Sequence, residues 1–155
     1  MSIACYGSLS YVKNIEYAGS ESCSAIIDGG NGSKLYTSDA LEFEGDYFIR
    51  EPYGESGYKV RTGYGAEIGT YSYVKAYGDR LLCFDNNKYY LYDRYANLLG
   101  EYENRPKISA YNGNTVVKND DGTYTCYDRD MNVLLTTKYD IQPIENGYCS
   151  FADNE

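Results

Sequence analysis

The chain has 155 residues, of which 43% are hydrophobic and 24% are charged, and its formal net charge is −9 at pH 7. This length and composition fit one folded domain with its own core. The negative charge argues against nonspecific binding to DNA, RNA or anionic lipid, because clustered Lys and Arg hold phosphate groups. The absence of histidine removes Ser-His-Asp, Cys-His and His-metal sites from consideration.

The first residues, MSIACYGSLSYVKN, lack the basic region and apolar run of a secretory signal. No stretch approaches the run of about eighteen apolar residues that a membrane span needs. The cysteines are odd in number and have no CxxC spacing: Cys5, Cys23, Cys83, Cys126 and Cys149. This pattern favours reduced thiols and predicts a cytoplasmic protein.

Residues 1–45 form an irregular first unit, although SYVKN from Ser10 resembles SYVKA from Ser72. Within it, GGNGSK from Gly29 lacks the spacing of a phosphate-binding loop and predicts a hairpin loop. Three units follow at residues 46–78, 79–113 and 114–147, and residues 148–155 match the opening of a fifth. We therefore expect a single repeat domain over residues 1–155.

The repeat is clearest where Gly78–Leu99 aligns with Gly113–Leu134, without a gap, after a shift of 35 residues. Eight of the 22 aligned positions are identical: Gly78/Gly113, Asp85/Asp120, Tyr89/Tyr124, Tyr92/Tyr127, Asp93/Asp128, Arg94/Arg129, Asn97/Asn132 and Leu99/Leu134. Farther upstream, Ile68, Gly69 and Tyr71 match Leu99, Gly100 and Tyr102. Stacked units bury the same positions in turn, so such a chain repeats its core-facing residues.

Within one unit the pattern is that of strands and turns. In residues 114–147, the runs NTVVKN, TYTCYD and VLLTTKY are separated by the turns DDG and RDMN. Asp, Asn and Gly suit such turns because they tolerate positive φ. No window has the apolar spacing of an amphipathic helix. The sequence predicts an all-β fold of tandem three-stranded units of about 34 residues, as a propeller-like ring or an open stacked β-array.

The repeat also predicts which side chains pack. We expect Leu81 and Val116 to line the core, and the repeated pairs Tyr89/Tyr124 and Tyr92/Tyr127 to pack between units. A strand over residues 148–153 is expected to pair with the irregular N-terminal unit, because this would cover an open sheet edge.

Residues 122–154, GTYTCYDRDMNVLLTTKYDIQPIENGYCSFADN, resemble the bacterial WG repeat. Tyr127-Asp128 stand at its I-D position, Lys138-Tyr139-Asp140 at its K-Y-D position and Asn146-Gly147 at its N-G position. The Trp-Gly pair that gives the repeat its name is replaced by Thr125-Cys126. The resemblance implies a β-rich repeat protein of bacterial or phage origin that acts as a binding module, and it implies no catalytic residues.

Two turns are rich in oxygen ligands, DNN from Asp85 and NDDG from Asn119. Neither has the twelve-residue loop with a terminal Glu that binds Ca²⁺ in EF-hands, so both are interpreted as turns. Cys126 replaces Leu91 of the preceding unit, which indicates a small core residue rather than a nucleophile.

Asp128 and Asp130 are spaced for carboxylate acid–base chemistry. The preceding unit argues against it, because Asp130 is replaced there by Tyr95. We expect Asp128 and its equivalent Asp93 to cap turns, or to pair with Arg129 and Arg94. No catalytic residue, cofactor or metal site is predicted.

Tyrosine and arginine are the best candidates for partner contacts, because both are enriched at interface hot spots. Tyr53, Tyr58, Arg61 and Tyr64 lie in YGESGYKVRTGYG, which carries extra turn residues relative to the other units. Insertions of this kind map to surface loops, although a tyrosine-rich strand face that only packs is the alternative. The repeated residues Tyr92, Asp93, Arg94, Tyr127, Asp128 and Arg129 are the candidates if the chain holds a ligand pocket.

Together these features favour a non-enzymatic binding protein that engages a protein partner. An inhibitor or toxin-neutralising protein, whose acidic surface approaches a basic site, is the narrower form of this prediction. The first alternative is a carbohydrate- or cell-wall-binding module, since tyrosine faces stack on sugars. The second is a small-ligand-binding or hydrolytic protein with a central pocket. Nucleic acid and membrane are not expected partners.

Overall fold

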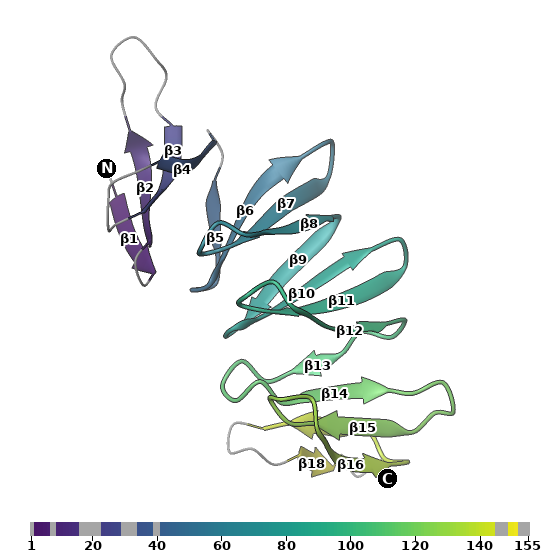
Figure 1. The fold of residues 1–155 in the computed structure, drawn as a ribbon. Helices are drawn as coiled ribbons and strands as arrows, with labels where there is room; N and C mark the ends of the chain where they lie inside the picture. The colour runs from purple at the N-terminus through teal and green to yellow at the C-terminus, as the bar shows by residue number, and fades with distance from the viewer. Residues whose placement is uncertain are drawn as a thin grey trace. The chain divides into compact units, whose positions relative to one another are not determined.

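The computed structural model describes residues 2–6, 9–15, 23–28, 34–38, 41–144 and 149–151, with side chains over 41–144. Eighteen strands and no helix occur in these residues, so the chain is all-β as predicted (Figure 1). No helix of the described part is long and apolar enough to cross a membrane. The chain divides into two compact units, one of residues 1–73 with Arg94–Ala96 and one of Val74–Asp93 with residues 97–155.

The first unit contains two antiparallel sheets of four strands. One sheet consists of β1 (Ser2–Tyr6), β2 (Leu9–Ile15), β3 (Cys23–Asp28) and β4 (Lys34–Ser38), in this spatial order. The other consists of β5 (Glu42–Glu44), β6 (Phe48–Tyr53), β7 (Gly57–Thr62) and β8 (Glu67–Tyr71). Phe48, Ile49 and Val60 are at most 1% exposed and contribute to the core of this sheet.

The second unit contains sheets built in the same way. β9 (Tyr73–Tyr77), β10 (Arg80–Asp85), β11 (Lys88–Asp93) and β12 (Leu98–Tyr102) form one meander. β13 (Lys107–Ile108), β14 (Thr115–Lys118), β15 (Tyr124–Tyr127) and β16 (Val133–Thr137) form the next. β17 (Ile141–Pro143) and β18 (Cys149–Phe151) form a two-stranded sheet.

Two expectations about strands differ from the structure. Each complete sheet has four strands rather than three, because a short strand (β5, β9 or β13) precedes the three that the repeat shows. These first strands read EFE, YVKAY and KI, so they share little sequence that a self-comparison could detect. Among the described strands, β18 pairs with β17, so the expected pairing with the N-terminal unit is wrong.

The repeated apolar positions form the core of the second unit, as predicted. Leu81 and Val116 are at most 1% exposed. Leu82 and Leu91 form one cluster with Ile108 of the next sheet, and Val116 and Cys126 form another with Ile141. Tyr89 and Tyr124 pack at the margins of these two clusters. Each sheet therefore buries its aliphatic residues against the first strand of the following sheet.

A difference in turn type shifts the pairing of two hairpins that align in sequence without a gap. Leu91 pairs with Leu82. Cys126, the repeat equivalent of Leu91, pairs instead with Val116, which is one residue before the repeat equivalent of Leu82. The β10–β11 turn is the Asn86-Asn87 pair, with φ of 49° and 62°, which fits a two-residue type I′ turn. The β14–β15 turn is longer and closes with Asn119 N donating to Thr123 O at 2.8 Å. A one-residue change of register turns the opposite side chain toward the core, so Leu82 joins one cluster and Val116 the other.

Candidate functional site

The predicted contact residues Tyr53 and Tyr58 lie at the β6–β7 hairpin. Tyr53 ends β6 and is 57% exposed. Tyr58 is half-buried, because the guanidinium of Arg50 lies over its ring, with 4.7 Å from Cζ to the ring centroid. Tyr53 is therefore open to a partner, whereas Tyr58 already has a cation–π contact within its own sheet.

Arg61 and Tyr64 lie near the opposite end of β7. Arg61 donates from Nη2 to Glu67 Oε2 at 3.1 Å and from Nη1 to the carbonyl oxygen of Gly65 at 3.3 Å. Tyr64 follows in the β7–β8 connection and is 44% exposed. Because Tyr58 and Arg61 are three residues apart on one strand, their side chains point to opposite faces of the sheet. The four residues thus occupy two separate places, and their role as partner contacts stays a prediction.

The repeated Tyr-Asp-Arg residues form the turns β11–β12 and β15–β16. Asp93 accepts from the backbone N and the Nδ2 of Asn97, at 2.9 Å each. Asp128 accepts in the same way from Asn132, with 2.8 Å from the backbone N to Oδ1. These bonds confirm the predicted turn-capping role of both aspartates. They also hold the pKa of Asp128 below its usual value, because the amide donors of Asn132 favour the ionised form.

The arginines of the two turns contact residues outside their own turns. Arg129 forms an ion pair with Asp79 in the second unit. Arg94, its repeat equivalent, donates to the Tyr95 hydroxyl at 2.6 Å and lies over the Tyr47 ring at 5.3 Å, all within the first unit. Tyr92 and Tyr127 are half-buried. The geometry of these six residues is therefore that of structural turns.

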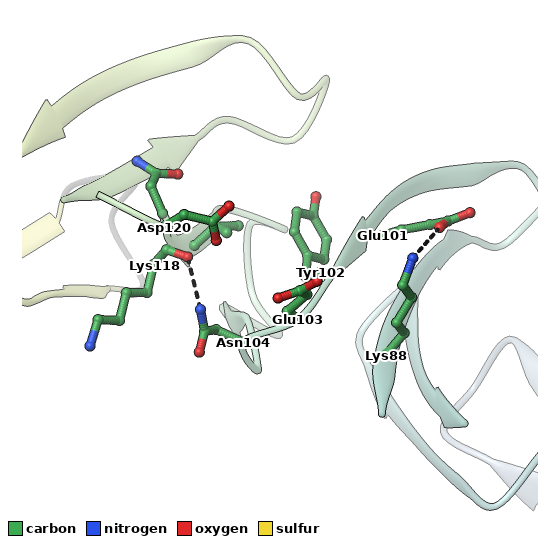
Figure 2. A pocket seen from close by; sticks show the side chains of 9 residues that line it. Lys88, Glu101, Tyr102, Glu103, Asn104, Lys118 and Asp120 are labelled. Atoms are coloured by element: carbon green, nitrogen blue, oxygen red, sulfur yellow. Dashed lines mark hydrogen bonds and ion pairs between the residues drawn. The ribbon is translucent and has the colours of Figure 1, made fainter. Parts of the chain in front are cut away.

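A groove of about 430 Å³ lies in the second unit between the sheets that contain β12 and β14 (Figure 2). We call it the β12–β14 groove. Lys88 of β11, the segment from Glu101 to Asn104 and the segment from Val117 to Asp120 line it. The side chain of Asn104 crosses toward β14, and its Nδ2 lies 3.5 Å from the carbonyl oxygen of Lys118.

The charges of the groove are unevenly balanced. Lys88 Nζ lies 3.8 Å from Glu101 Oε2, so these two residues largely neutralise each other. Lys118 Nζ lies 6.0 Å from the Tyr124 ring centroid, and its ammonium points away from Asp120 in Figure 2. Within residues 41–144, no ion pair involves Glu103 or Asp120. The groove therefore offers two carboxylates to a cation.

Tyr102 of β12 is the aromatic residue of the groove. Burial raises its pKa to about 12, and the neighbouring Tyr127 adds to this rise. The ring of Tyr102 also folds back over Gly100 of its own strand, where a Cβ would lie 3.0 Å from Cε2. Tyr71 covers Gly69 of β8 in the same way. The repeated Gly-x-Tyr thus places an aromatic ring over a glycine of the edge strands β8 and β12.

Sequence reasoning did not identify the β12–β14 groove. Its walls come from two repeat units, and only the Asn119-Asp120 turn drew attention, as a possible cation ligand. That turn is closed by internal bonds, including Thr123 Oγ1 to Asp121 Oδ1 at 2.6 Å, which agrees with its interpretation as a turn. Cys126 is fully buried, as its interpretation as a small core residue requires. The sequence feature that could have indicated the groove is the pair of acidic residues Glu101 and Glu103 on either side of a tyrosine.

No family model matches the chain, and no curated protein matches it. Solved structures that it resembles include HIRA(644–1017), at 9% identity with a TM-score of 0.38, where the match covers 81% of this chain and 50% of that one. BamB from Moraxella catarrhalis is 10% identical, with a TM-score of 0.36, and the match covers 89% of this chain and 48% of that one. The WD40 β-propeller domain of Doa1 is 12% identical, with a TM-score of 0.34, and the match covers 95% of this chain and 58% of that one. This chain spans about half the length of these proteins, and the WG-repeat resemblance stays a prediction.

Proposed function

We propose that this chain is a non-enzymatic binding protein that engages a protein partner through the β12–β14 groove. The observation that carries the proposal is the pair of carboxylates, Glu103 and Asp120, that line the groove without a described ion pair of their own. Each can accept charge-assisted hydrogen bonds from a basic side chain.

The remaining residues of the groove suit the same ligand class. The Tyr102 ring offers a face to a guanidinium or ammonium group, and the amides of Asn104 and Asn119 add hydrogen-bonding capacity. The net charge of −9 attracts a basic partner over longer distances, which speeds association at low salt. An inhibitory or toxin-neutralising role is a narrower form of this proposal, and the negative charge is its sole support.

The tyrosines of the β6–β7 region form a second part of the proposal. Tyr53 and Tyr64 are the exposed members of the predicted set, at 57% and 44%. Substituting each by Ser removes aromatic contact area while it leaves the buried residues of the sheet unchanged. Weaker capture of an identified partner by these variants would support a contact role, and unchanged capture would contradict it.

The groove is tested with short probes in place of the unidentified partner. We would titrate the full chain with a Gly-Ser peptide that carries three Arg residues, and with the matched Glu peptide, and follow backbone amide NMR signals. We expect the Arg peptide to shift the signals of Tyr102, Asn104 and Asn119, and the shifts to vanish in the E103Q/D120N variant. The control E55Q/D130N removes the same charge from exposed positions outside the groove.

Two outcomes would contradict the proposal. In one, the Arg peptide shifts signals equally in E103Q/D120N and in the wild type, so that only the net charge matters. In the other, neither peptide shifts groove signals, while the protein sediments with insoluble cell-wall material. That result would favour the carbohydrate-binding alternative.

A further inference from the structure

Among the edge strands of the three four-stranded sheets within residues 41–144, β16 is the one without a charged residue. The three four-stranded sheets within residues 41–144 have six edge strands: β5, β8, β9, β12, β13 and β16. Five of them carry a charged residue: Glu42 and Glu44 in β5, Glu67 in β8, Lys75 in β9, Glu101 in β12 and Lys107 in β13. β16 reads VLLTT. Charged residues on edge strands oppose pairing with another chain, and β16 has no such protection.

β16 also exposes apolar side chains on both of its faces. Three consecutive residues, Val133, Leu134 and Leu135, are 61%, 52% and 36% exposed. In β12 the equivalent of Leu134 is Leu99, which packs against the cluster that includes Ile108. Leu135 pairs with Cys126 and Val133 with Tyr127, and Leu134 is the extra residue of the β-bulge between them. Because Cys126 and Tyr127 are successive residues that face opposite sides of the sheet, both sides of β16 present aliphatic surface to solvent.

The repeat shows that this surface is a local departure. Gly100 of β12 is replaced by Leu135, and Tyr102, whose ring covers Gly100, is replaced by Thr137. β8 retains the glycine and the tyrosine, as Gly69 and Tyr71. β16 therefore lacks the ring that covers β8 and β12, and a leucine side chain stands at the position of the glycine.

We propose that β16 pairs antiparallel with β16 of a second copy of this chain. Pairing centred on Leu135 places Leu135 opposite Leu135, Leu134 opposite Thr136 and Val133 opposite Thr137. Every pair is uncharged, which matters because two copies that each carry −9 repel each other elsewhere. The pairing satisfies backbone groups at the outer edge of β16 and joins two four-stranded sheets into one.

The interface is small, since β16 has five residues. Association through one strand pair buries less surface than a standard interface, so the dimer is expected to be weak and concentration-dependent. We would measure the mass of the full chain in solution by sedimentation velocity from about 10 µM to about 1 mM, a range that covers weak association. The expected result is a rise from the monomer mass toward twice that value.

Leu135→Lys is the test variant and Leu98→Lys is its matched control. Leu98 is an exposed leucine on edge strand β12, at 47% exposure. Each substitution makes the net charge less negative by one, so general repulsion between copies decreases equally in both. Leu135→Lys places two ammonium groups opposite each other and should abolish the dimer, whereas Leu98→Lys should dimerise as the wild type does.

Circular dichroism and thermal melting establish that both variants fold. If Leu135→Lys does not fold, Leu134→Lys replaces it, because Leu134 is more exposed and lies opposite Thr136 in the pairing. Amide hydrogen exchange gives a second readout, as exchange over β16 should slow with rising wild-type concentration. A monomeric wild type throughout the range would overturn the proposal, and so would a folded Leu135→Lys variant that dimerises normally.

Discussion

Arg80 donates a hydrogen bond from Nη2 to the backbone carbonyl oxygen of Arg129, 2.6 Å away. Arg80 is 6% exposed, and its Nη1 lies 3.6 Å from Asp79 Oδ1. Asp79 in turn forms an ion pair with Arg129. These contacts join the β9–β10 turn to the β15–β16 turn, so that two sheets of the second unit share one buried polar network.

Replacing Arg80 by Leu should lower the free energy of unfolding by about 3–5 kcal/mol, the usual cost of breaking a buried charge pair from one side. The substitution leaves the carbonyl oxygen of Arg129 without its buried donor and removes one of the two cations that pair with the carboxylate of Asp79. Urea denaturation of the two proteins measures the difference. Arg129→Gln is the comparison, because that side chain is 54% exposed and its carbonyl remains. We expect it to lose about 1 kcal/mol or less, and equal losses in both variants would contradict the network.

Ala96→Gly should stabilise the protein by about 1 kcal/mol, because a residue with Cβ is disfavoured in the left-handed region. Ala96 has φ of 70° in the β11–β12 turn, and its repeat equivalent Met131 has 63° in the β15–β16 turn. The melting temperature should rise by about 2–4 °C. Ala76→Gly, within strand β9, is the control and should lower the melting temperature instead. A fall for Ala96→Gly would show that the turn has another conformation.

Asp128 should make stability depend on acid pH. Its pKa in the folded protein is lowered, first by the side-chain amide of Asn132 and then by the backbone N–H of the same residue. Because the pKa of Asp128 is lower in the folded protein than its unfolded value of 3.8, its ionised carboxylate stabilises the folded protein at pH values above 3.8. This stabilisation is lost as the pH falls through the folded pKa. Melting curves from neutral to acid pH should therefore show a smaller acid loss in Asp128→Asn than in the wild type. Identical pH profiles would be inconsistent with the turn bonds to Asn132.

Tyr102 should show its burial in an alkaline titration. Its pKa is raised from 10.0 to about 12, mainly by burial. Because the folded pKa exceeds the unfolded one, the resulting stability is present below pH 10 and is lost as the pH rises toward 12. Ultraviolet difference spectra should contain one late-ionising tyrosine that is absent in Tyr102→Phe. A late phase that persists in Tyr102→Phe would assign it to another tyrosine.

Much of the local structure was predictable from the repeat. The equivalence of Leu91 and Cys126 identified one buried position in two sheets, and the repeated residues Asp93 and Asp128 identified two capped turns. The fourth strand of each sheet was not predictable, because β13 is only Lys107-Ile108 and has no repeated pattern. The separation of Tyr58 from Arg61 also required the strand geometry, since sequence proximity suggested one cluster.

The all-β and repetitive character of this protein follows from its sequence, because core positions and turn residues act locally and leave a periodic pattern. Which side chains meet across sheets depends on the folded structure. Leu82 packs in the core cluster of one sheet and Val116 in that of the next, although the two residues are not equivalent in the repeat. The cause is that the turns Asn86-Asn87 and Asn119–Gly122 set different registers. Glu103 and Asp120 line one groove because two sheets of the second unit pack together, although nothing in their local sequence pairs them. Register and packing depend on contacts between distant residues, and a single sequence does not record such contacts directly.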